Sequence, residues 1–334
     1  MDTQKQIAII GSGSWATAIL KILGEKNVQL HWYVRKHEVV EHIKKFRRNP
    51  NYISSAELPI EKIIFHATPE AAIANAEIVI AATPSAFLRP TLEHLTSENF
   101  NNKIVVSAIK GMIPDTDENL IIAEYFNKYF QIDFKNFVVI SGPCHAEEVA
   151  LEKLSYLTLS CPDTSKASAM ADLMACRYIK THFTEDIYGT ELAAVMKNII
   201  ALASGICHGL GYGDNFQAVL ISNAIQEIKR FVDAVHPIER DIKGSAYLGD
   251  LLVTAYSQFS RNRAFGLMIG KGYSVKAAQL EMNMIAEGYY SVKCIHEANE
   301  KYKVELPITT AVYNILYEKM SAIMEIKLMT EKLK

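Results

Sequence analysis

Short apolar runs and segments of helical period alternate along the first half of the chain. The runs occupy residues 7–10, 29–34, 63–66, 78–82, 104–107 and 137–141, and helix-length segments such as 15–23, 84–95 and 117–129 lie between several of them. Strands and helices that alternate in this way predict a doubly wound parallel sheet. Two further short runs, 156–160 and 178–181, are expected to extend the edge of that sheet.

After about residue 184 the pattern changes to long segments of helical period, at 189–210, 216–235 and 274–302. Glycine and proline in this half mostly lie between the segments. The pattern therefore predicts an α/β chain of two domains, a sheet domain over residues 1–184 and an all-helical domain over residues 185–334. A length of 334 residues and a hydrophobic fraction of 49% are sufficient for a core in each domain.

The first apolar run leads directly into the sequence GSGSWA at residues 11–16, and then into a helix-like segment. Gly11 permits a sharp turn, Gly13 lets bare backbone approach a pyrophosphate, and Ala16 is small enough for helix and strand to pack closely. The helix N-terminus presents N–H groups and a partial positive charge to the phosphates. The motif predicts a dinucleotide-binding, Rossmann-type domain, although small residues also occur in ordinary turns between strand and helix.

The end of the second expected strand bears on the choice of coenzyme. NAD-binding domains usually place Asp or Glu there, where the carboxylate accepts hydrogen bonds from ribose hydroxyls. This chain has Arg35 and Lys36 instead, and a guanidinium matches the 2′-phosphate of NADP or stacks on adenine. We therefore expect NADP to be preferred, with NAD possible. The alternative is that both side chains are solvated surface charges.

Composition excludes several classes of partner. A net charge of −2 offers no electrostatic footprint for nucleic acid or an anionic membrane. The five cysteines are scattered, without a CxxC pair or a histidine spacing suited to zinc, which favours reduced thiols in the cytoplasm and no metal site. The N-terminus lacks the layout of a signal peptide. The most apolar segment, 192–210, contains Lys197, Asn198 and His208, so a buried core helix is expected rather than a membrane span.

Three segments are candidates for chemistry. Lys110 follows an expected strand in SAIKGM, where a lysine can meet an anionic substrate or is simply exposed. Residues 140–148, ISGPCHAEE, lie at a strand-to-helix transition, and their small residues either let backbone approach a ligand or form an ordinary turn. Lys197 within an apolar helix is the best candidate for an acid/base group, unless its stem packs on the core and its ammonium reaches solvent. SRNR at 260–263 supplies hydrogen-bond donors suited to a phosphate monoester, or else these are ordinary polar side chains on the surface. His145 and His208 are expected to be packed or solvent-facing.

Taken in order, these segments resemble the NAD(P)-dependent glycerol-3-phosphate dehydrogenases, which interconvert dihydroxyacetone phosphate and sn-glycerol 3-phosphate. The likeness covers nearly the whole chain. It is carried by GSGSWA at Gly11, SAIKGM at Ser107, ISGPCHAEEVA at Ile140, AVMKNIIALASGICHGLGYGDN at Ala194, LGDLLVT at Leu248, SRNRAFG at Ser260, AEGYYSVK at Ala286 and ELPIT at Glu305.

The resemblance implies roles for the matching positions. Lys197 matches the catalytic lysine that exchanges the proton of the carbonyl oxygen, and Lys110 and Asp250 match residues that hold the reacting end of the substrate. Further substrate contacts are implied at Gly142, Cys144, Asn198, Thr254, Ser260, Arg261 and Asn262, the last three at the phosphate. Coenzyme contacts are implied at Gly11, Gly13, Ser14, Trp15, Arg35, Lys110, Ala146, Arg261, Ile285 and Glu287. A homodimer that supplies a phospholipid precursor is also implied.

The chain departs from the family pattern in places. Cys144 stands where many relatives carry Ser or Thr, and a thiol is the poorer hydrogen-bond donor. Ser222-Asn223-Ala224 stands where relatives often show Thr-Arg-Gly, and a glycine that often precedes Leu-Gly-Asp is absent at Tyr247. Two other hypotheses remain open: an NADP-dependent β-hydroxyacid or ketopantoate-type reductase, whose carboxylate substrate an arginine cluster could also bind, and a non-catalytic dinucleotide sensor.

Overall fold

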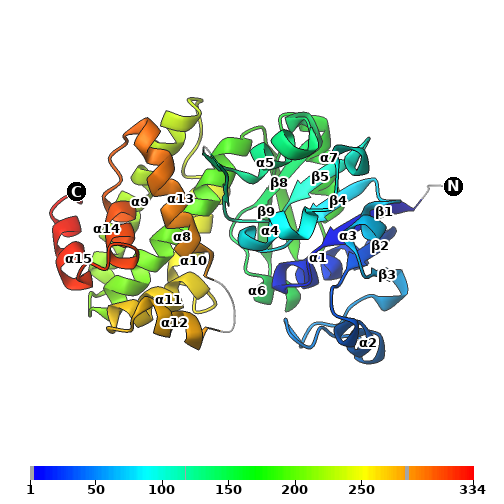
Figure 1. The fold of residues 1–334 in the computed structure, drawn as a ribbon, viewed down its shortest axis with the longest axis horizontal. Coiled ribbons are helices and arrows are strands. Elements are labelled where there is room, and N and C mark those ends of the chain that lie inside the picture. Colours follow the sequence, from blue (N-terminus) through cyan, green and yellow to red (C-terminus); the bar gives the residue numbers. More distant parts are fainter. Residues whose placement is uncertain (1–3, 117, 283–285) are drawn as a thin grey trace. The chain divides into compact units, whose positions relative to one another are not determined.

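Eight strands form one sheet in the first half of the chain (Figure 1). The computed structural model describes residues 4–116, 118–282 and 286–334. The strand order is β10-β9-β8-β5-β4-β1-β2-β3, with β1 (Lys5–Ile10), β2 (Val28–Tyr33), β3 (Ile63–His66), β4 (Ile78–Ala81), β5 (Ile104–Ser107), β8 (Phe137–Ser141), β9 (Ser155–Ser160) and β10 (Ile179–Thr184). All eight strands expected from the apolar runs are confirmed.

The sheet departs from a wholly parallel arrangement at one pair. β9 runs antiparallel to β8, whereas the other neighbouring strands are parallel. The connection between β8 and β9 contains one helix of five residues, α6 (Ala146–Ala150). Such a helix rises only about 8 Å, roughly half the length of a five-residue strand. The chain therefore does not return to the start of β8 before β9 begins.

Helices and short turns connect the strands of this half. They are α1 (Ser14–Gly24), α2 (His37–Phe46), η1 (Ile60–Lys62), α3 (Pro69–Ile73), α4 (Ser85–Leu92), η2 (Ser97–Phe100), α5 (Ile122–Phe130), η3 (Phe134–Asn136) and α7 (Thr164–Met174). The helix expected at 117–129 begins only at Ile122, because β6 (Ile113–Pro114) and β7 (Asn119–Leu120) pair as a small antiparallel hairpin. Ile9, Leu30 and Leu159 are fully buried within the sheet core.

The second half of the chain is helical, as expected. It comprises α8 (Ile187–Gly209), α9 (Asp214–Val235), the π-helical turn η4 (Ser245–Gly249), α10 (Asp250–Tyr256), α11 (Arg261–Gly270), α12 (Val275–Glu281), α13 (Glu287–Tyr302), α14 (Pro307–Leu316) and α15 (Ala322–Thr330). The single helix expected at 274–302 is wrong. Among the described residues of this range, α12 and α13 are separate helices, because Met282 after α12 and Ala286 before α13 both have extended backbone, which ends a helix.

Close packing of α8 and α11 depends on glycine. A Cβ added at Gly205 of α8 would lie 2.1 Å from the Arg263 carbonyl oxygen, and one added at Gly266 of α11 would lie 2.2 Å from the Leu202 carbonyl oxygen. The two backbones therefore touch without side chains between them. α8 is long and apolar enough to cross a membrane, but 89% of its most apolar window is buried inside the protein, as in a core helix.

The chain divides into two units. The first comprises Met1–Ile109 and Ile122–Ile187, and the second comprises Lys110–Ile121 and Tyr188–Lys334. The β6–β7 hairpin thus belongs to the helical unit, whereas the sequence suggested one boundary at 184/185. The reason is a local contact, since Asn119 Nδ2 donates to the Cys294 carbonyl oxygen at 3.3 Å and to the Glu297 carboxylate at 2.8 Å on α13.

Candidate active site

The glycine-rich turn of the first unit joins β1 to α1. Gly11 has φ +124°, and a Cβ there would lie 2.6 Å from the Ala82 carbonyl oxygen, so only glycine is accommodated. Gly13 is the N-cap of α1, and a Cβ added to it would meet no described atom within 4 Å. Ser14 and Trp15 are the first residues of that helix. Open space beside bare backbone at a helix N-terminus fits a dinucleotide pyrophosphate.

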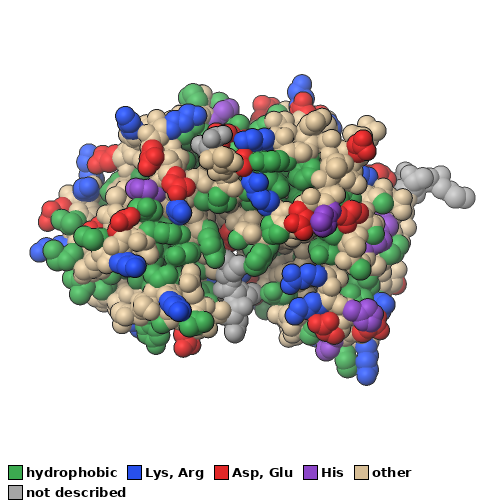
Figure 2. All heavy atoms as spheres, in the orientation of Figure 1, with side chains coloured by type: hydrophobic (Ala, Val, Ile, Leu, Met, Phe, Trp, Pro, Cys, Tyr) green, Lys and Arg blue, Asp and Glu red, His purple; other side chains and the backbone are tan. Residues whose placement is uncertain are grey.

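A cavity of about 290 Å³ lies beside the end of β2. Arg35 and Lys36 follow this strand and are both exposed, but only Lys36 lines the cavity. The full lining is Lys36, Glu38, Val39, His42, Pro50 and Asn51. Figure 2 shows basic, acidic and histidine side chains mixed over α2. Any selection of a 2′-phosphate here would therefore depend on individual cations and not on a basic surface.

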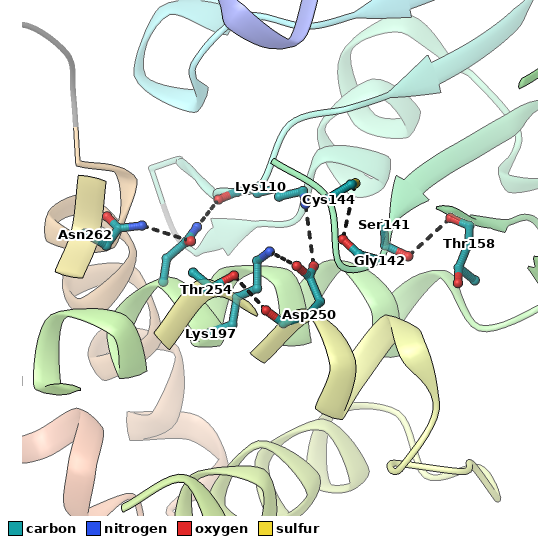
Figure 3. Close-up of polar contacts among 10 residues, drawn as sticks. Lys110, Ser141, Gly142, Cys144, Thr158, Lys197, Asp250, Thr254 and Asn262 are labelled. Atoms are coloured by element: carbon teal, nitrogen blue, oxygen red, sulfur yellow. Dashed lines mark hydrogen bonds and ion pairs between the residues drawn. The ribbon is translucent and has the colours of Figure 1, made fainter. Parts of the chain in front are cut away.

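The segment after β8 turns sharply at Gly142. Its φ is +108°, and a Cβ there would lie 2.7 Å from the Tyr156 carbonyl oxygen. Cys144 is buried, and its Sγ donates to the Gly142 carbonyl oxygen at 3.4 Å (Figure 3). The thiol thus takes part in the turn itself. Ala146, also buried, is the first residue of α6.

Three charged side chains meet in the second unit (Figure 3). Lys197 on α8 forms an ion pair with Oδ1 of Asp250, and Lys110 Nζ lies 3.5 Å from Oδ2 of the same carboxylate. The side chains of Asp250, Lys197 and Lys110 are 1%, 5% and 14% exposed. Asp250 is the first residue of α10 and directly follows the π-helical turn η4, which fixes its backbone. One buried carboxylate therefore holds two ammonium groups together.

A chain of amide hydrogen bonds lies beside this cluster. Asn198 Nδ2 donates to the Lys110 carbonyl oxygen, Asn262 Nδ2 donates to Asn198 Oδ1, and the Gly288 N–H donates to Asn262 Oδ1, each at 2.9 Å. The bonds join α8, α11, α13 and the Lys110 backbone. Sequence reasoning missed Gly288, where a Cβ would lie 2.5 Å from the Asn198 carbonyl oxygen. A glycine directly after the helix-starting Glu287 was the available signal.

The N-terminus of α11 holds the residues that the sequence suggested for binding phosphate. Ser260 is the N-cap, and its hydroxyl accepts from the Arg263 N–H at 3.3 Å. Arg261 is exposed and is the first helical residue. The Thr254 hydroxyl instead donates within its own helix, to the Asp250 carbonyl oxygen at 2.6 Å. Cations, a hydroxyl and helix N–H groups in one unit suit a phosphorylated ligand.

The structure therefore brings together Lys110, Lys197, Asn198, Asp250, Thr254 and Asn262 through direct contacts, with Ser260 and Arg261 next to Asn262 along the chain. Ile285 lies outside the described residues. Glu287 is the half-buried first residue of α13. The candidates Gly11, Gly13, Ser14, Trp15, Arg35, Gly142, Cys144 and Ala146 lie in the first unit.

Comparison with known proteins identifies the family. The family profile of the NAD-dependent glycerol-3-phosphate dehydrogenase N-terminus matches residues 6–167, and that of the C-terminus matches residues 186–327. The chain belongs to this family. A glycerol-3-phosphate dehydrogenase [NAD(P)+] of Clostridium botulinum is 37% identical over 316 residues, covering 94% of this chain and 93% of the relative. One of Listeria monocytogenes is 36% identical over 323 residues, covering 96% and 94%.

A solved structure extends the comparison to the fold. The crystal structure of glycerol-3-phosphate dehydrogenase from Coxiella burnetii superposes with a TM-score of 0.90 at 26% identity, covering 98% of this chain and 99% of that one. The resemblance inferred from the eight motifs is confirmed at the level of family and fold.

One departure from the glycerol-3-phosphate dehydrogenase pattern has a structural counterpart. Asn223, one of the departures noted in the sequence, is half-buried on α9 and exchanges hydrogen bonds with Lys334. Its Nδ2 donates to the Lys334 carbonyl oxygen at 2.8 Å, and the Lys334 N–H donates to Asn223 Oδ1 at 3.0 Å. In this family member the position therefore links Lys334 to α9.

Proposed function

We propose that this chain catalyses the reversible reduction of dihydroxyacetone phosphate to sn-glycerol 3-phosphate, with NADPH preferred over NADH. Membership of the family supports the reaction. The observation that carries the proposal is the buried Lys197–Asp250–Lys110 cluster, held in the same helical unit as the donors at the start of α11. A buried ammonium beside a second cation is suited to a carbonyl oxygen that gains negative charge.

The coenzyme, when bound, supplies or accepts the hydride at C2 of the substrate. Gly11, Gly13, Ser14 and Trp15 would hold its pyrophosphate. Arg35 would meet the 2′-phosphate, with Lys36 in the adjoining cavity. The remaining coenzyme contacts are proposed at Lys110, Ala146, Arg261, Ile285 and Glu287.

The protein's part in the reaction is to move one proton and to balance charge. In the direction of reduction, the Lys197 ammonium donates a proton to the ketone oxygen, which becomes the hydroxyl of the product. Lys110 stabilises the negative charge that develops on this oxygen before the proton arrives. Asp250 holds both amines in place, because each of its oxygens contacts one of them. In the reverse direction the neutral Lys197 amine accepts the hydroxyl proton.

The substrate phosphate is proposed to bind at Ser260, Arg261 and Asn262. Arg261 can donate two parallel hydrogen bonds to phosphate oxygens, and the helix N-terminus adds a partial positive charge. Asn198 and Asn262 already hold one another, so each has one amide hydrogen besides the one in the amide chain. Gly142, Cys144 and Thr254 complete the proposed substrate contacts, with Cys144 contributing its backbone N–H because its thiol donates to Gly142.

Replacing Lys197 by Met tests the reaction, because Met keeps the apolar stem and removes the ammonium. We expect kcat to fall roughly 100-fold or more, the usual loss for a general acid, while the Kd for NADPH stays within about twofold of the wild type. Lys271→Met, at an exposed position after α11, is the matched control. A Lys197→Met enzyme with normal kcat would refute the assignment. Assays with dihydroxyacetone phosphate against a 2-oxo acid separate this function from a ketopantoate-type reductase, and reduction of neither ketone would favour a dinucleotide sensor.

A cytoplasmic homodimer is the proposed state of the protein. Ile323, Met324 and Leu328 on α15 are at least half exposed, and a second copy of the chain could cover them. All five cysteines are thiols, which suits a reducing compartment. Light scattering on a size-exclusion column tests the dimer, and Ile323→Glu should convert it to a monomer.

A further inference from the structure

The three consecutive carbonyl oxygens of the glycine-rich turn are each held by a different buried side chain. Trp32 Nε1 on β2 donates to the Gly11 carbonyl oxygen at 2.7 Å. Asn49, after α2, donates from Nδ2 to the Ser12 carbonyl oxygen at 3.1 Å, and the Thr17 hydroxyl on α1 donates to the Gly13 carbonyl oxygen at 3.0 Å. The Gly13 carbonyl oxygen also accepts the Thr17 backbone N–H at 3.0 Å, the first hydrogen bond of the helix. Trp32, Asn49 and Thr17 are all 0% exposed. We call them the carbonyl-holding residues.

Holding these oxygens also sets the directions of the backbone N–H groups. In a trans peptide unit the C=O and the following N–H point in opposite directions, and the described backbone contains no cis peptide bond. The Gly11 carbonyl therefore determines the direction of the Ser12 N–H, the Ser12 carbonyl that of the Gly13 N–H, and the Gly13 carbonyl that of the Ser14 N–H. Each N–H group therefore points away from the residue that holds the carbonyl of its own peptide unit.

The hydrogen bonds of Asn49 and Thr17 depend on one another. Asn49 Oδ1 accepts from the Asn51 N–H at 3.1 Å, and this bond fixes the orientation of the side-chain amide, so that Nδ2 faces the glycine-rich turn. Its two hydrogens are used by the Ser12 carbonyl oxygen and, at 2.9 Å, by Thr17 Oγ1. The Thr17 hydroxyl consequently accepts from Asn49 and passes its own hydrogen to Gly13. Loss of this hydroxyl would leave the Gly13 carbonyl oxygen with only its helical backbone bond and would remove one of the two acceptors that fix the Asn49 amide beside Ser12.

We propose that Trp32, Asn49 and Thr17 are positioning residues that preorganise the Ser12, Gly13 and Ser14 N–H groups for the coenzyme pyrophosphate. The inference rests on the coenzyme role proposed above for the glycine-rich turn. Preorganised donors lower the cost of binding. Because the pyrophosphate is common to NADPH and NADH, loss of a positioning residue weakens both equally. It leaves the proton transfer at Lys197 unchanged once the coenzyme is saturating.

Thr17 offers the sharpest test, because Thr17→Val removes the hydroxyl with little change of shape and Thr17→Ser retains it. The Kd for NADPH and for NADH is measured from coenzyme fluorescence without substrate, and kcat at saturating coenzyme. We expect Thr17→Val to raise both Kd values about tenfold, equivalent to about 1.4 kcal/mol, with their ratio and kcat within about twofold of the wild type. Thr17→Ser should restore both Kd values to about the wild-type level.

Thr309→Val is the matched control. It also removes a buried threonine hydroxyl, which donates to Glu227 in the helical unit, and should lower stability without changing either Kd. Trp32→Phe supplies a second test if Thr17→Val does not fold, because it removes only the donor to Gly11 and part of the ring. Unchanged Kd values in the folded variants, or a rise for NADPH alone, would overturn the inference.

Failure of the proposed function itself is recognised in the wild type. Binding of coenzyme without reduction of dihydroxyacetone phosphate would refute the proposed reaction. The inference about Thr17 would then still be decided by the Kd values for NADPH and NADH. Absence of coenzyme binding in the wild-type protein would overturn both.

Discussion

Asp250→Asn should destabilise the helical unit more than removal of either lysine that contacts it. Asparagine has the size of aspartate but carries no charge, so the substitution isolates the electrostatic part of the interaction. In the wild type, one carboxylate that is 1% exposed lies between the ammonium groups of Lys197 and Lys110. The variant would leave two positive charges close together with no anion between them.

The expected magnitude follows from burial and distance. At about 4 Å and an effective dielectric constant of about 20, each ion pair contributes roughly 4 kcal/mol of attraction, most of which offsets desolvation. Removing one partner of a buried pair costs about 3–5 kcal/mol of unfolding free energy. Lys197→Met should cost roughly half as much, because Asp250 keeps Lys110, and the double variant should lose less than the sum of the two single losses.

Urea unfolding followed by circular dichroism measures these free energies, at low salt and at about 0.5 M salt, where exposed pairs are screened but buried ones much less. In a thermal melt, the same loss of about 3–5 kcal/mol in Asp250→Asn should lower Tm by roughly 6–20 °C, at the usual 2–4 °C per kcal/mol for domains of 150–250 residues. Equal losses for Asp250→Asn and Lys197→Met, or strict additivity in the double variant, would refute a carboxylate shared by two ammonium groups.

Three further outcomes are expected. Arg261→Ala should raise the KM for dihydroxyacetone phosphate roughly 10- to 150-fold and abolish its preference over unphosphorylated dihydroxyacetone, since charge-assisted hydrogen bonds are lost. Arg35→Asp should raise the KM for NADPH on the order of tenfold and that for NADH much less. Burial and the neighbouring His66 lower the pKa of His31. As pH falls, His31 is therefore protonated in the unfolded chain before it is protonated in the folded protein. The unfolding free energy should fall as pH drops below about 6.5, the usual pKa of histidine in an unfolded chain.

Each of these outcomes has a control and a contrary result. Lys271→Ala, at the far end of α11, should leave the substrate preference intact, and an unchanged preference in Arg261→Ala would place the phosphate elsewhere. Lys45→Asp on α2 is the control for Arg35→Asp. An equal rise of the KM for NADPH and for NADH in Arg35→Asp would contradict a contact between Arg35 and the 2′-phosphate. Thermal melts between pH 7.5 and 5.5 test His31, and a His31→Gln variant with the same acid sensitivity would contradict its role.

Local patterns in the sequence were sufficient for the eight strands and for several helices, among them α1, α8 and α9. Short apolar runs mark the strands, and this information lies within a few neighbouring positions. The same information does not contain the direction of β9, which depends on how far the short helix α6 can carry the chain. The break between α12 and α13 was also missed, because residues 274–302 keep a helical period through it.

The sequence by itself determined the family, the two-part architecture, and the presence of a lysine in the middle of an apolar helix. Only the tertiary structure decided that Lys197 meets Asp250, 53 positions later, and that Asn198 holds the Lys110 backbone, 88 positions earlier. It also decided that Trp32 and Asn49 hold the carbonyl oxygens of the glycine-rich turn. Such contacts join residues that are distant along the chain, so no local period or spacing encodes them, and they form only when whole helices and strands pack together.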